Sequence, residues 1–146
     1  MVTDRDLGFN AIIHELKQLD GKEVKAGVLK DAGDNNGIPL VNIAFWNEYG
    51  TRHIPSRPFV RIASDENKSK WGNVASEGVG QIIERRIKWR KCCGMVGEQM
   101  RGDIKKVIGD KSKLAPNALS TIRRKGHDKP LIETGLMKSK VDFRID

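Results

Sequence analysis

The stretch NEYGTRHIPSRPFVRIA, residues 47–63, gathers an acid, a histidine, hydroxyl groups and guanidinium groups around two prolines. Glu48 and His53 could form an acid–base pair, and Thr51 or Ser56 could then serve as the activated nucleophile. The rest of the sequence contains no glycine-rich phosphate loop, no GxSxG and no HExxH motif. We therefore expect no enzymatic activity and assign no catalytic residue.

The cysteines and histidines do not have the spacing of metal ligands. Cys92 and Cys93 are adjacent, and on a helix their side chains would diverge by about 100°, too far for a bridge without distortion. His14, His53 and His127 are scattered along the chain. The sequence predicts free, at least half-buried thiols, no metal site and no cofactor.

The chain is basic, with 27 Lys and Arg against 19 Asp and Glu, and a formal net charge of +8. Such a balance favours anionic partners. Two basic runs stand out, ERRIKWRK at 84–91 and TIRRKGHDK at 121–129. They could bind nucleic acid through phosphate contacts and stacking on Trp89. No recognition-helix or RNA-binding motif accompanies them, so we favour solvated or protein-facing helix surfaces.

A membrane location is not expected. No apolar run approaches the ~18 residues that a transmembrane helix needs. The first residues, MVTDRDLGFNAII, contain early acids and no basic region before an apolar core, which is not the pattern of a signal peptide. The sequence predicts a soluble cytosolic product.

Hydrophobic periodicity predicts the elements in the first third of the chain. A helix is expected over 5–19, a half-buried strand within 22–30, and a turn-rich loop over 31–39. Residues 40–49 are apolar on most sides and predict a short helix, buried on much of its circumference and ended by Gly50.

The central third predicts long helices. Pro55 and Pro58 favour an extended path, and the chain from Pro58 to about Gly109 has helical character, with a break between 78 and 86. Ser64, followed by acids, is a candidate N-cap. One helical face is apolar and has glycines beside it that suggest close packing: Cys93, Val96, Met100, Ile104, Val107, Ile108, with Gly94, Gly97 and Gly102.

The last third predicts a small helix and a strand. Pro116 suits the first turn of a helix that runs through Arg124 and ends at Gly126. The final residues, 140–146, alternate apolar and polar side chains, which is typical of an amphipathic strand. Together the elements predict a single α+β domain spanning 1–146, with a small, mainly antiparallel sheet packed against two or three long helices.

Three blocks of sequence, in order, resemble one protein family. These are WNEYGTRHIPSRPFVR at 46–61, GEQMRGDIKKVI at 97–108, and LAPNALSTIRRKGHDKPLIETGLMKSKVDFRI at 114–145. The family comprises the tail-completion and minor tail-component proteins of tailed bacteriophages and Mu-like prophages, also called virion morphogenesis proteins. The resemblance covers roughly residues 40–146. Two mild departures are Glu133, where Asp is common in the family, and Lys140, where an apolar residue is usual.

The residues that match the family motifs lie in the first and third blocks. They are Glu48, Gly50, Thr51, Pro55, Arg57, Pro58 and Phe59, and then Lys125, Gly126, Pro130, Leu131, Ile132, Thr134 and Gly135.

The resemblance implies a structural role at the neck or head-proximal end of the phage tail. Members of the family are thought to form rings that join the tail tube to the head connector. The expected partners are therefore copies of this chain, in a hexameric ring by analogy, together with tail-tube and head-connector proteins and genomic DNA nearby. The expected location is the virion, and the host cytoplasm during assembly. The alternative function is a basic nucleic-acid-binding module.

Charged residues in the first and third blocks are the candidates for contacts with subunits or partners. Arg57 and Arg61 lie one turn apart if a helix begins at Pro58, and each could bind a carboxylate in bidentate fashion. Glu48 would be the acceptor, within the subunit or on a neighbour. The full set of interface candidates is Glu48, Arg52, Arg57, Arg61, Arg123, Arg124 and Lys125.

Overall fold

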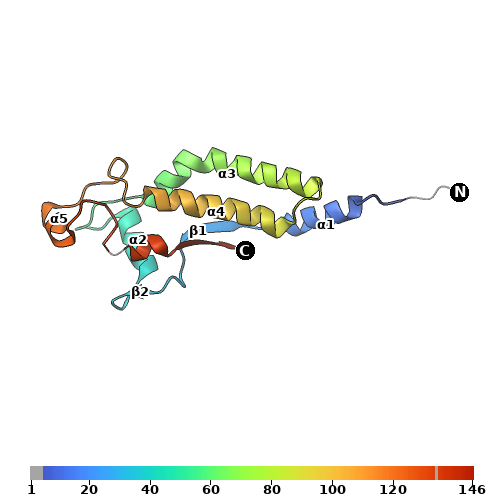
Figure 1. The fold of residues 1–146 in the computed structure, drawn as a ribbon. Helices are drawn as coiled ribbons and strands as arrows, with labels where there is room; N and C mark the ends of the chain where they lie inside the picture. The colour runs from blue at the N-terminus through green and yellow to red at the C-terminus, as the bar shows by residue number, and fades with distance from the viewer. Residues whose placement is uncertain (1–4, 134) are drawn as a thin grey trace.

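The longest elements of the chain form a helical hairpin with a short sheet beside it (Figure 1). The computed structural model describes residues 5–133 and 135–146. Helix α3 spans Phe59–Ile83 and α4 spans Trp89–Val107, and the short turn at 84–88 lets them pack along one another. The break that the sequence predicted between two long helices is confirmed, a few residues later than expected.

The main sheet pairs two strands from opposite ends of the chain. Strand β1, Val24–Val28, lies antiparallel to β4, Val141–Ile145, with Val28 opposite Val141. Side chains along β4 alternate as predicted, since Val141 is buried whereas Asp142 and Arg144 are exposed. Both strands contact α4, so the expected α+β arrangement, with long helices covering one face of a small sheet, is confirmed.

Helix α4 approaches the sheet most closely at Gly97. A Cβ atom at this position would lie 2.0 Å from Cδ2 of Phe143 on β4, so only a glycine leaves room for the ring. Gly94 and Gly102 on the same helix have open space around them. Close packing, which the sequence suggested for all three glycines, is therefore correct at Gly97 alone, and the neighbour there is a side chain.

A second, smaller ladder follows β1. Strands β2, Asp34–Asn35, and β3, Ile38–Pro39, pair antiparallel. Asn36 and Gly37 between them both have positive φ, 53° and 81°, as a two-residue hairpin turn of this handedness requires. The segment predicted as a turn-rich loop is thus a tight hairpin, and it leads directly into α2, Leu40–Tyr49.

Helix α1, Phe9–Leu19, packs against α3 and α4 at one end of the molecule (Figure 1). It begins later than the predicted residue 5 because Asp6 caps it. The carboxylate of Asp6 accepts the backbone N–H groups of Gly8, at 2.9 Å, and Phe9, at 2.7 Å. These hydrogen bonds hold the pKa of the Asp6 carboxyl below its ordinary value.

Helices α2 and α5 lie at the other end of the molecule (Figure 1). Helix α5 spans Leu119–Lys125 and ends at Gly126, as predicted, and the short α6 spans Leu136–Ser139. Two helix starts were predicted wrongly. Pro116 precedes α5 instead of lying in its first turn, and Ser64 lies inside α3 instead of capping it.

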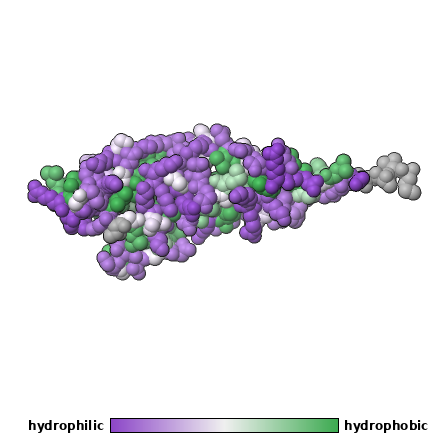
Figure 2. Space-filling model, in the orientation of Figure 1, coloured by the Kyte–Doolittle hydropathy of each residue, from purple (hydrophilic) through white to green (hydrophobic). Residues whose placement is uncertain are grey.

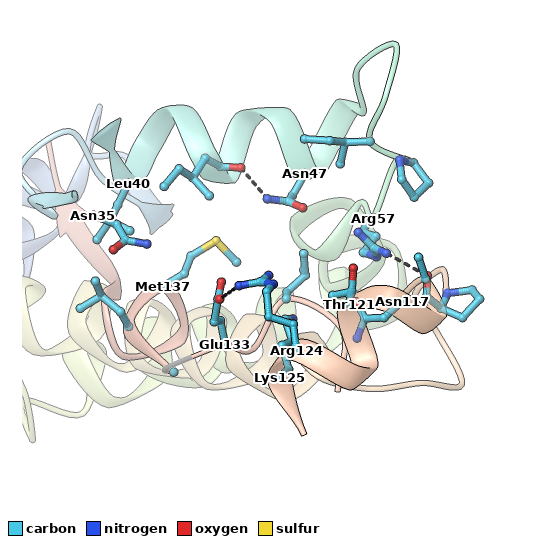
Figure 3. A pocket seen from close by; sticks show the side chains of 18 of the residues that line it. Asn35, Leu40, Asn47, Arg57, Asn117, Thr121, Arg124, Lys125, Glu133 and Met137 are labelled. Atoms are coloured by element: carbon cyan, nitrogen blue, oxygen red, sulfur yellow. Dashed lines mark hydrogen bonds and ion pairs between the residues drawn. The ribbon is translucent and has the colours of Figure 1, made fainter. Parts of the chain in front are cut away.

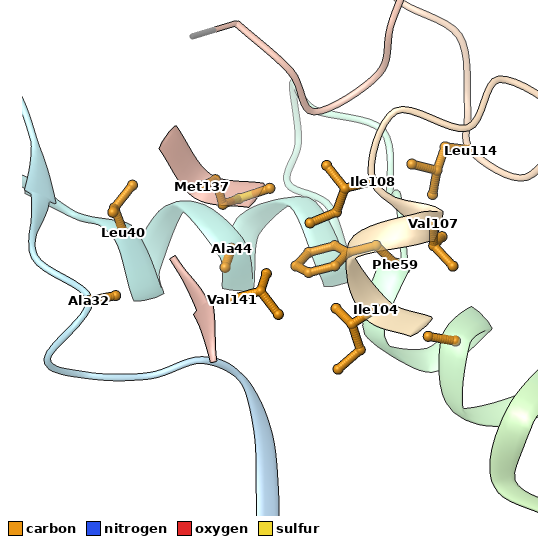
Figure 4. Packing of buried hydrophobic residues seen from close by; sticks show 11 residues of the cluster. Ala32, Leu40, Ala44, Phe59, Ile104, Val107, Ile108, Leu114, Met137 and Val141 are labelled. Atoms are coloured by element: carbon orange, nitrogen blue, oxygen red, sulfur yellow. The ribbon is translucent and has the colours of Figure 1, made fainter. Parts of the chain in front are cut away.

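The hydrophobic core sits where α2, α3, α4, α6 and β4 meet (Figure 4). Phe59, in the first turn of α3, is only 1% exposed and lies at its centre. Its neighbours in the cluster include Leu40 and Ala44 from α2, Ala63 from α3, Ile104 and Val107 from α4, Ile108, Met137 from α6 and Val141 from β4. The core therefore holds α2 and the start of α3 at a fixed angle, and the chain between these helices must form a tight corner.

Candidate interaction site

The corner between α2 and α3, residues 50–58, is held by its own polar groups. The hydroxyl of Thr51 accepts the backbone N–H groups of His53 and Ile54. Ser56 donates its hydroxyl to the carbonyl of Glu48, and Arg57 donates its backbone N–H to the carbonyl of Asn47. Gly50 has a φ of 79°, and a Cβ there would lie 2.9 Å from the backbone nitrogen of Ser56. The corner thus requires glycine at its first residue.

Glu48 caps α3 from the neighbouring helix. Its carboxylate accepts the backbone N–H of Val60 at 2.9 Å and that of Arg61 at 3.0 Å. The side chain is only 9% exposed. A carboxylate at this place satisfies two of the free amides of the first turn and complements the helix dipole.

Arg57 ties the corner to the loop that precedes α5. Its Nε donates to the carbonyl of Ala115 and its Nη2 to the carbonyl of Pro116, both at 2.8 Å. The residue is 9% exposed, and burial lowers the pKa of its guanidinium below the ordinary value. The sequence-based expectation that Glu48 pairs with Arg57 or Arg61 inside the subunit is wrong, because Glu48 binds backbone amides and Arg57 binds carbonyls.

The residues that suggested catalysis are used to build this corner. The hydroxyls of Thr51 and Ser56 are engaged in the hydrogen bonds described above, and the Glu48 carboxylate faces the first turn of α3. His53 is exposed on the corner. Thr51, Ser56 and Glu48 therefore all contribute hydrogen bonds that hold the corner.

The corner and the third sequence block line one cleft of about 730 Å³ (Figure 3). One wall is the inner face of α2, with Leu40 and Asn47. The opposite wall comes from α5 and the residues after it, and includes Lys125 and Met137, with Arg57 at one end. Segments about 60 residues or more apart in sequence thus meet here, and no local pattern predicts such a meeting.

Charges in the cleft are unevenly compensated. Arg124 forms an ion pair with Glu133. The Lys125 ammonium forms no ion pair with the residues that the structure describes. Burial lowers the pKa of Lys125; the charge of Glu133 opposes this, and those of Arg124 and Arg57 add to it. Gly135, which immediately precedes α6 and has a φ of 78°, also lines the cleft. Thr134 lies outside the described residues.

The remaining interface candidates are exposed. Arg52 lies on the corner and Arg123 on α5. Arg61 places its guanidinium over the ring of Tyr49, with 5.4 Å between the guanidinium carbon and the ring centroid. The aromatic ring that receives Arg61 belongs to a larger apolar surface on α2, which the sequence did not predict.

The outer face of α2 is exposed, contrary to the expectation of a largely buried helix. Phe45 and Tyr49 are each 60% exposed and Trp46 is 39% exposed. The rings of Phe45 and Tyr49 contact each other in a tilted arrangement, with centroids 4.8 Å apart and an interplanar angle of 44°. We call Phe45, Trp46, Tyr49 and Arg61 the α2 outer face. Helices that are apolar all round are normally covered on all sides, so this face has the character of an interface.

The two basic runs lie at opposite ends of the molecule (Figure 1). Residues 84–91 form the α3–α4 turn and the first turn of α4, whereas 123–125 belong to α5. In the first run Trp89 is flanked by Lys22, 5.2 Å from its ring centroid, and by Arg90, at 4.5 Å. Two cations thus already contact the aromatic ring that could have stacked on a base.

A buried charge cluster between α3 and α4 was missed in the sequence. Asp103, 2% exposed, accepts hydrogen bonds from Lys70 at 2.8 Å, from the Trp71 indole at 2.8 Å and from Gln99 at 3.1 Å. Burial alone would raise the pKa of Asp103, but these hydrogen bonds and the charge of Lys70 lower it to about 2. Asp103 precedes Ile104, which belongs to the predicted apolar stripe. An acidic residue beside that stripe is the feature of the sequence that could have indicated this cluster.

Cys92 and Cys93 are free and buried, as predicted. Burial raises the pKa of both thiols, which keeps them in the unreactive thiol form. Within residues 5–133 and 135–146, no cluster of three or more His, Cys, Asp or Glu side chains could hold a metal ion. None of the helices in these ranges has the length and apolar character needed to cross a bilayer.

Comparison with protein-family models, with curated proteins and with solved structures found no match to this chain.

Proposed function

We propose that this chain is a structural subunit of a bacteriophage virion, located at the neck or the head-proximal end of the tail. Copies of the chain assemble into a ring, hexameric by analogy with the family it resembles, and the ring joins the tail tube to the head connector. No catalytic step is part of this role. The proposal rests on the three ordered blocks of resemblance and on the exposed surface of α2.

The α2 outer face is the observation that carries the assembly part of the proposal. Phe45 and Tyr49 are mostly exposed although the chain has only four Phe, three Trp and one Tyr to build a core. Trp, Tyr and Arg are the side chains most enriched at the energetic centres of protein interfaces. In a ring such a face meets a different face of the next subunit, and every copy is then covered.

The corner supports the same role because it makes the α2 outer face rigid. Glu48 and Arg57 fix the corner from inside, so α2 and the start of α3 cannot rotate relative to each other. Arg61 on α3 and Tyr49 on α2 therefore form one preorganised surface. A preorganised surface loses little conformational entropy on binding, which favours assembly.

The alternative function, a nucleic-acid-binding module, would need the basic runs to act together. Their position at opposite ends of the molecule favours assembly over a single basic groove. DNA binding at physiological salt with a steep salt dependence would support the alternative. A basic subunit of a neck ring could still lie near the DNA that passes through the ring.

Light scattering after size-exclusion chromatography tests the proposal. We expect a ring-sized mass for the wild type and a monomer mass for the double variant Phe45→Ser with Tyr49→Ser. The matched control is Ile83→Ser, which removes a 52% exposed apolar side chain at the other end of α3 and should keep the ring mass. A wild-type protein that stays monomeric and does not bind purified tails would overturn the proposal.

A further inference from the structure

The cleft between α2 and α5 is not part of the surface that we propose for assembly. It lies on the inner side of α2, whereas Phe45, Trp46 and Tyr49 lie on the outer side of the same helix. Helical periodicity separates the two sets, since Leu40, Ile43 and Asn47 repeat at three and four residues and point together. The cleft is therefore a second surface, distinct from the α2 outer face.

From this geometry we propose that the cleft binds an extended acidic peptide segment of a partner protein. The carboxylate of the peptide lies against Lys125 and Arg57, and an adjacent apolar side chain packs on Leu40, Ile43 and Met137. This inference goes beyond the proposed function, because it assigns a second contact to a different kind of partner and does not require a ring.

Charge complementarity selects an acidic partner. Glu133, the acid of the cleft, is already paired with Arg124. Lys125 has no ion-pair partner in the described part of the chain, and Arg57 donates only to neutral carbonyls. Two partly buried cations thus lack an ion-pair partner within the described residues, and Lys125 has only the shared charge of Glu133 nearby. An incoming carboxylate would offset the hydration that burial has removed from them.

The neutral polar groups of the cleft suit a peptide backbone. The side-chain amide nitrogen of Asn117 is buried and has no hydrogen-bond partner among the described atoms. Asn117 lines the cleft, so a peptide carbonyl could accept its N–H. Asn47 donates its amide to the carbonyl of Ile43, and its side-chain oxygen accepts no hydrogen bond from the described residues, so it could accept a peptide N–H.

The apolar floor favours a peptide over a nucleic acid. Leu40 is 2% exposed and Met137 is 8% exposed, so both present only small apolar areas at the base of the cleft. A volume of about 730 Å³ is typical of a concave ligand site and is too confined for a duplex. Among the described residues of the lining there is no Phe, Tyr or Trp on which a single-stranded base could stack, and the only aromatic ring is the imidazole of His53.

Fluorescence anisotropy with a defined probe tests the inference. The probe is a fluorescein-labelled, C-terminally amidated hexapeptide, Leu-Asp-Leu-Glu-Leu-Asp, and its neutral counterpart is Leu-Asn-Leu-Gln-Leu-Asn. We expect the wild-type protein to bind the acidic probe at least about tenfold more tightly than the neutral one, because the carboxylates meet cations that lack an ion-pair partner within the described residues. A labelled oligothymidylate serves as the nucleic-acid probe in the same assay.

Variants of Lys125 locate the binding. Lys125→Glu and Lys125→Gln should each weaken binding of the acidic probe by about tenfold or more, whereas Lys125→Arg should retain it. The matched control is Lys68→Glu on the exposed side of α3, with an effect within about twofold. Circular dichroism confirms that each variant is folded.

Three results would overturn the inference. They are equal binding of the acidic and neutral probes, acidic-probe binding that is insensitive to Lys125, and binding of the oligothymidylate alone. Absence of probe binding by a protein that still forms a ring would reject the cleft proposal and leave the proposed function standing. Probe binding by a strict monomer that does not bind purified tails would reject the proposed function and leave the cleft proposal standing.

Discussion

Glu48 and Arg61 meet through a backbone hydrogen bond and not through an ion pair. The carboxylate of Glu48 accepts the N–H of Arg61 at 3.0 Å, while the Arg61 guanidinium lies over Tyr49. One acid thus joins α2 to α3 and leaves the arginine side chain available at the surface. The backbone of Arg61 therefore helps to hold the corner, while its side chain belongs to the proposed interface.

We predict that Glu48→Ala destabilises the protein by about 1–3 kcal/mol, because two partly buried amides at the start of α3 lose their acceptor. Glu48→Gln should destabilise the protein less than Glu48→Ala, since the amide oxygen can still accept one of the two N–H groups. Urea denaturation measures both changes. Asp65→Ala, at an exposed position on the same helix, is the control and should stay within about 0.5 kcal/mol of the wild type.

Arg57→Ala should lower the free energy of unfolding by about 2–3 kcal/mol, because two carbonyls lose a charged donor in a buried place. Limited proteolysis should also cleave the loop at 111–118 faster, since Arg57 no longer holds it. Arg52→Ala on the exposed corner is the control, and equal stability of the two variants would contradict the prediction.

The stability of the protein should fall at low pH through Asp103. Its folded pKa of about 2 lies below the ordinary 3.8, so the unfolded chain binds this proton more tightly. The stabilisation, about 2 kcal/mol, is complete above pH 3.8 and is lost as the pH falls through 2. Denaturation curves between pH 5 and pH 2 should therefore decline more steeply for the wild type than for Asp103→Asn.

Asp103→Asn should itself lower the free energy of unfolding by about 2–4 kcal/mol at neutral pH. The charge of Lys70 would then lie beside a neutral amide, and the amide N–H₂ group could not accept the hydrogen bond that the Trp71 indole donates. Lys70→Met provides a second variant that removes the cation instead of the anion. If the free energy of unfolding declined equally with falling pH in the wild type and in Asp103→Asn, another acid would control the loss of stability at low pH.

Gly97→Ala should destabilise the protein by about 1–3 kcal/mol, since the new methyl group overlaps the ring of Phe143. Gly94→Ala and Gly102→Ala are matched controls on the same helix. Both have open space, so each should be neutral or stabilise by up to about 1 kcal/mol through helix propensity. Thermal melts compare all three, and the double variant with Phe143→Leu should recover part of the loss at Gly97.

The sequence alone predicted most of the elements because their causes are local. The alternation of Val141, Phe143 and Ile145 predicted the last strand, and Gly126 predicted the end of α5. The apolar stripe over 93–108 predicted α4, and the α+β class followed from the elements together. Helix starts were less accurate: Ser64 has the chemistry of an N-cap, but Glu48 caps α3 from another helix, which no local rule anticipates.

The tertiary structure decided what the charged residues do. From sequence, Glu48 and Arg57 are two opposite charges nine positions apart, and an ion pair is the simplest interpretation. In the fold, Glu48 reaches the amides of α3, and Arg57 reaches carbonyls at 115 and 116 that the core brings within 2.8 Å. Hydrogen-bond partners and exposure depend on contacts between distant segments. The cleft at Lys125 and the α2 outer face therefore exist only once the chain is packed.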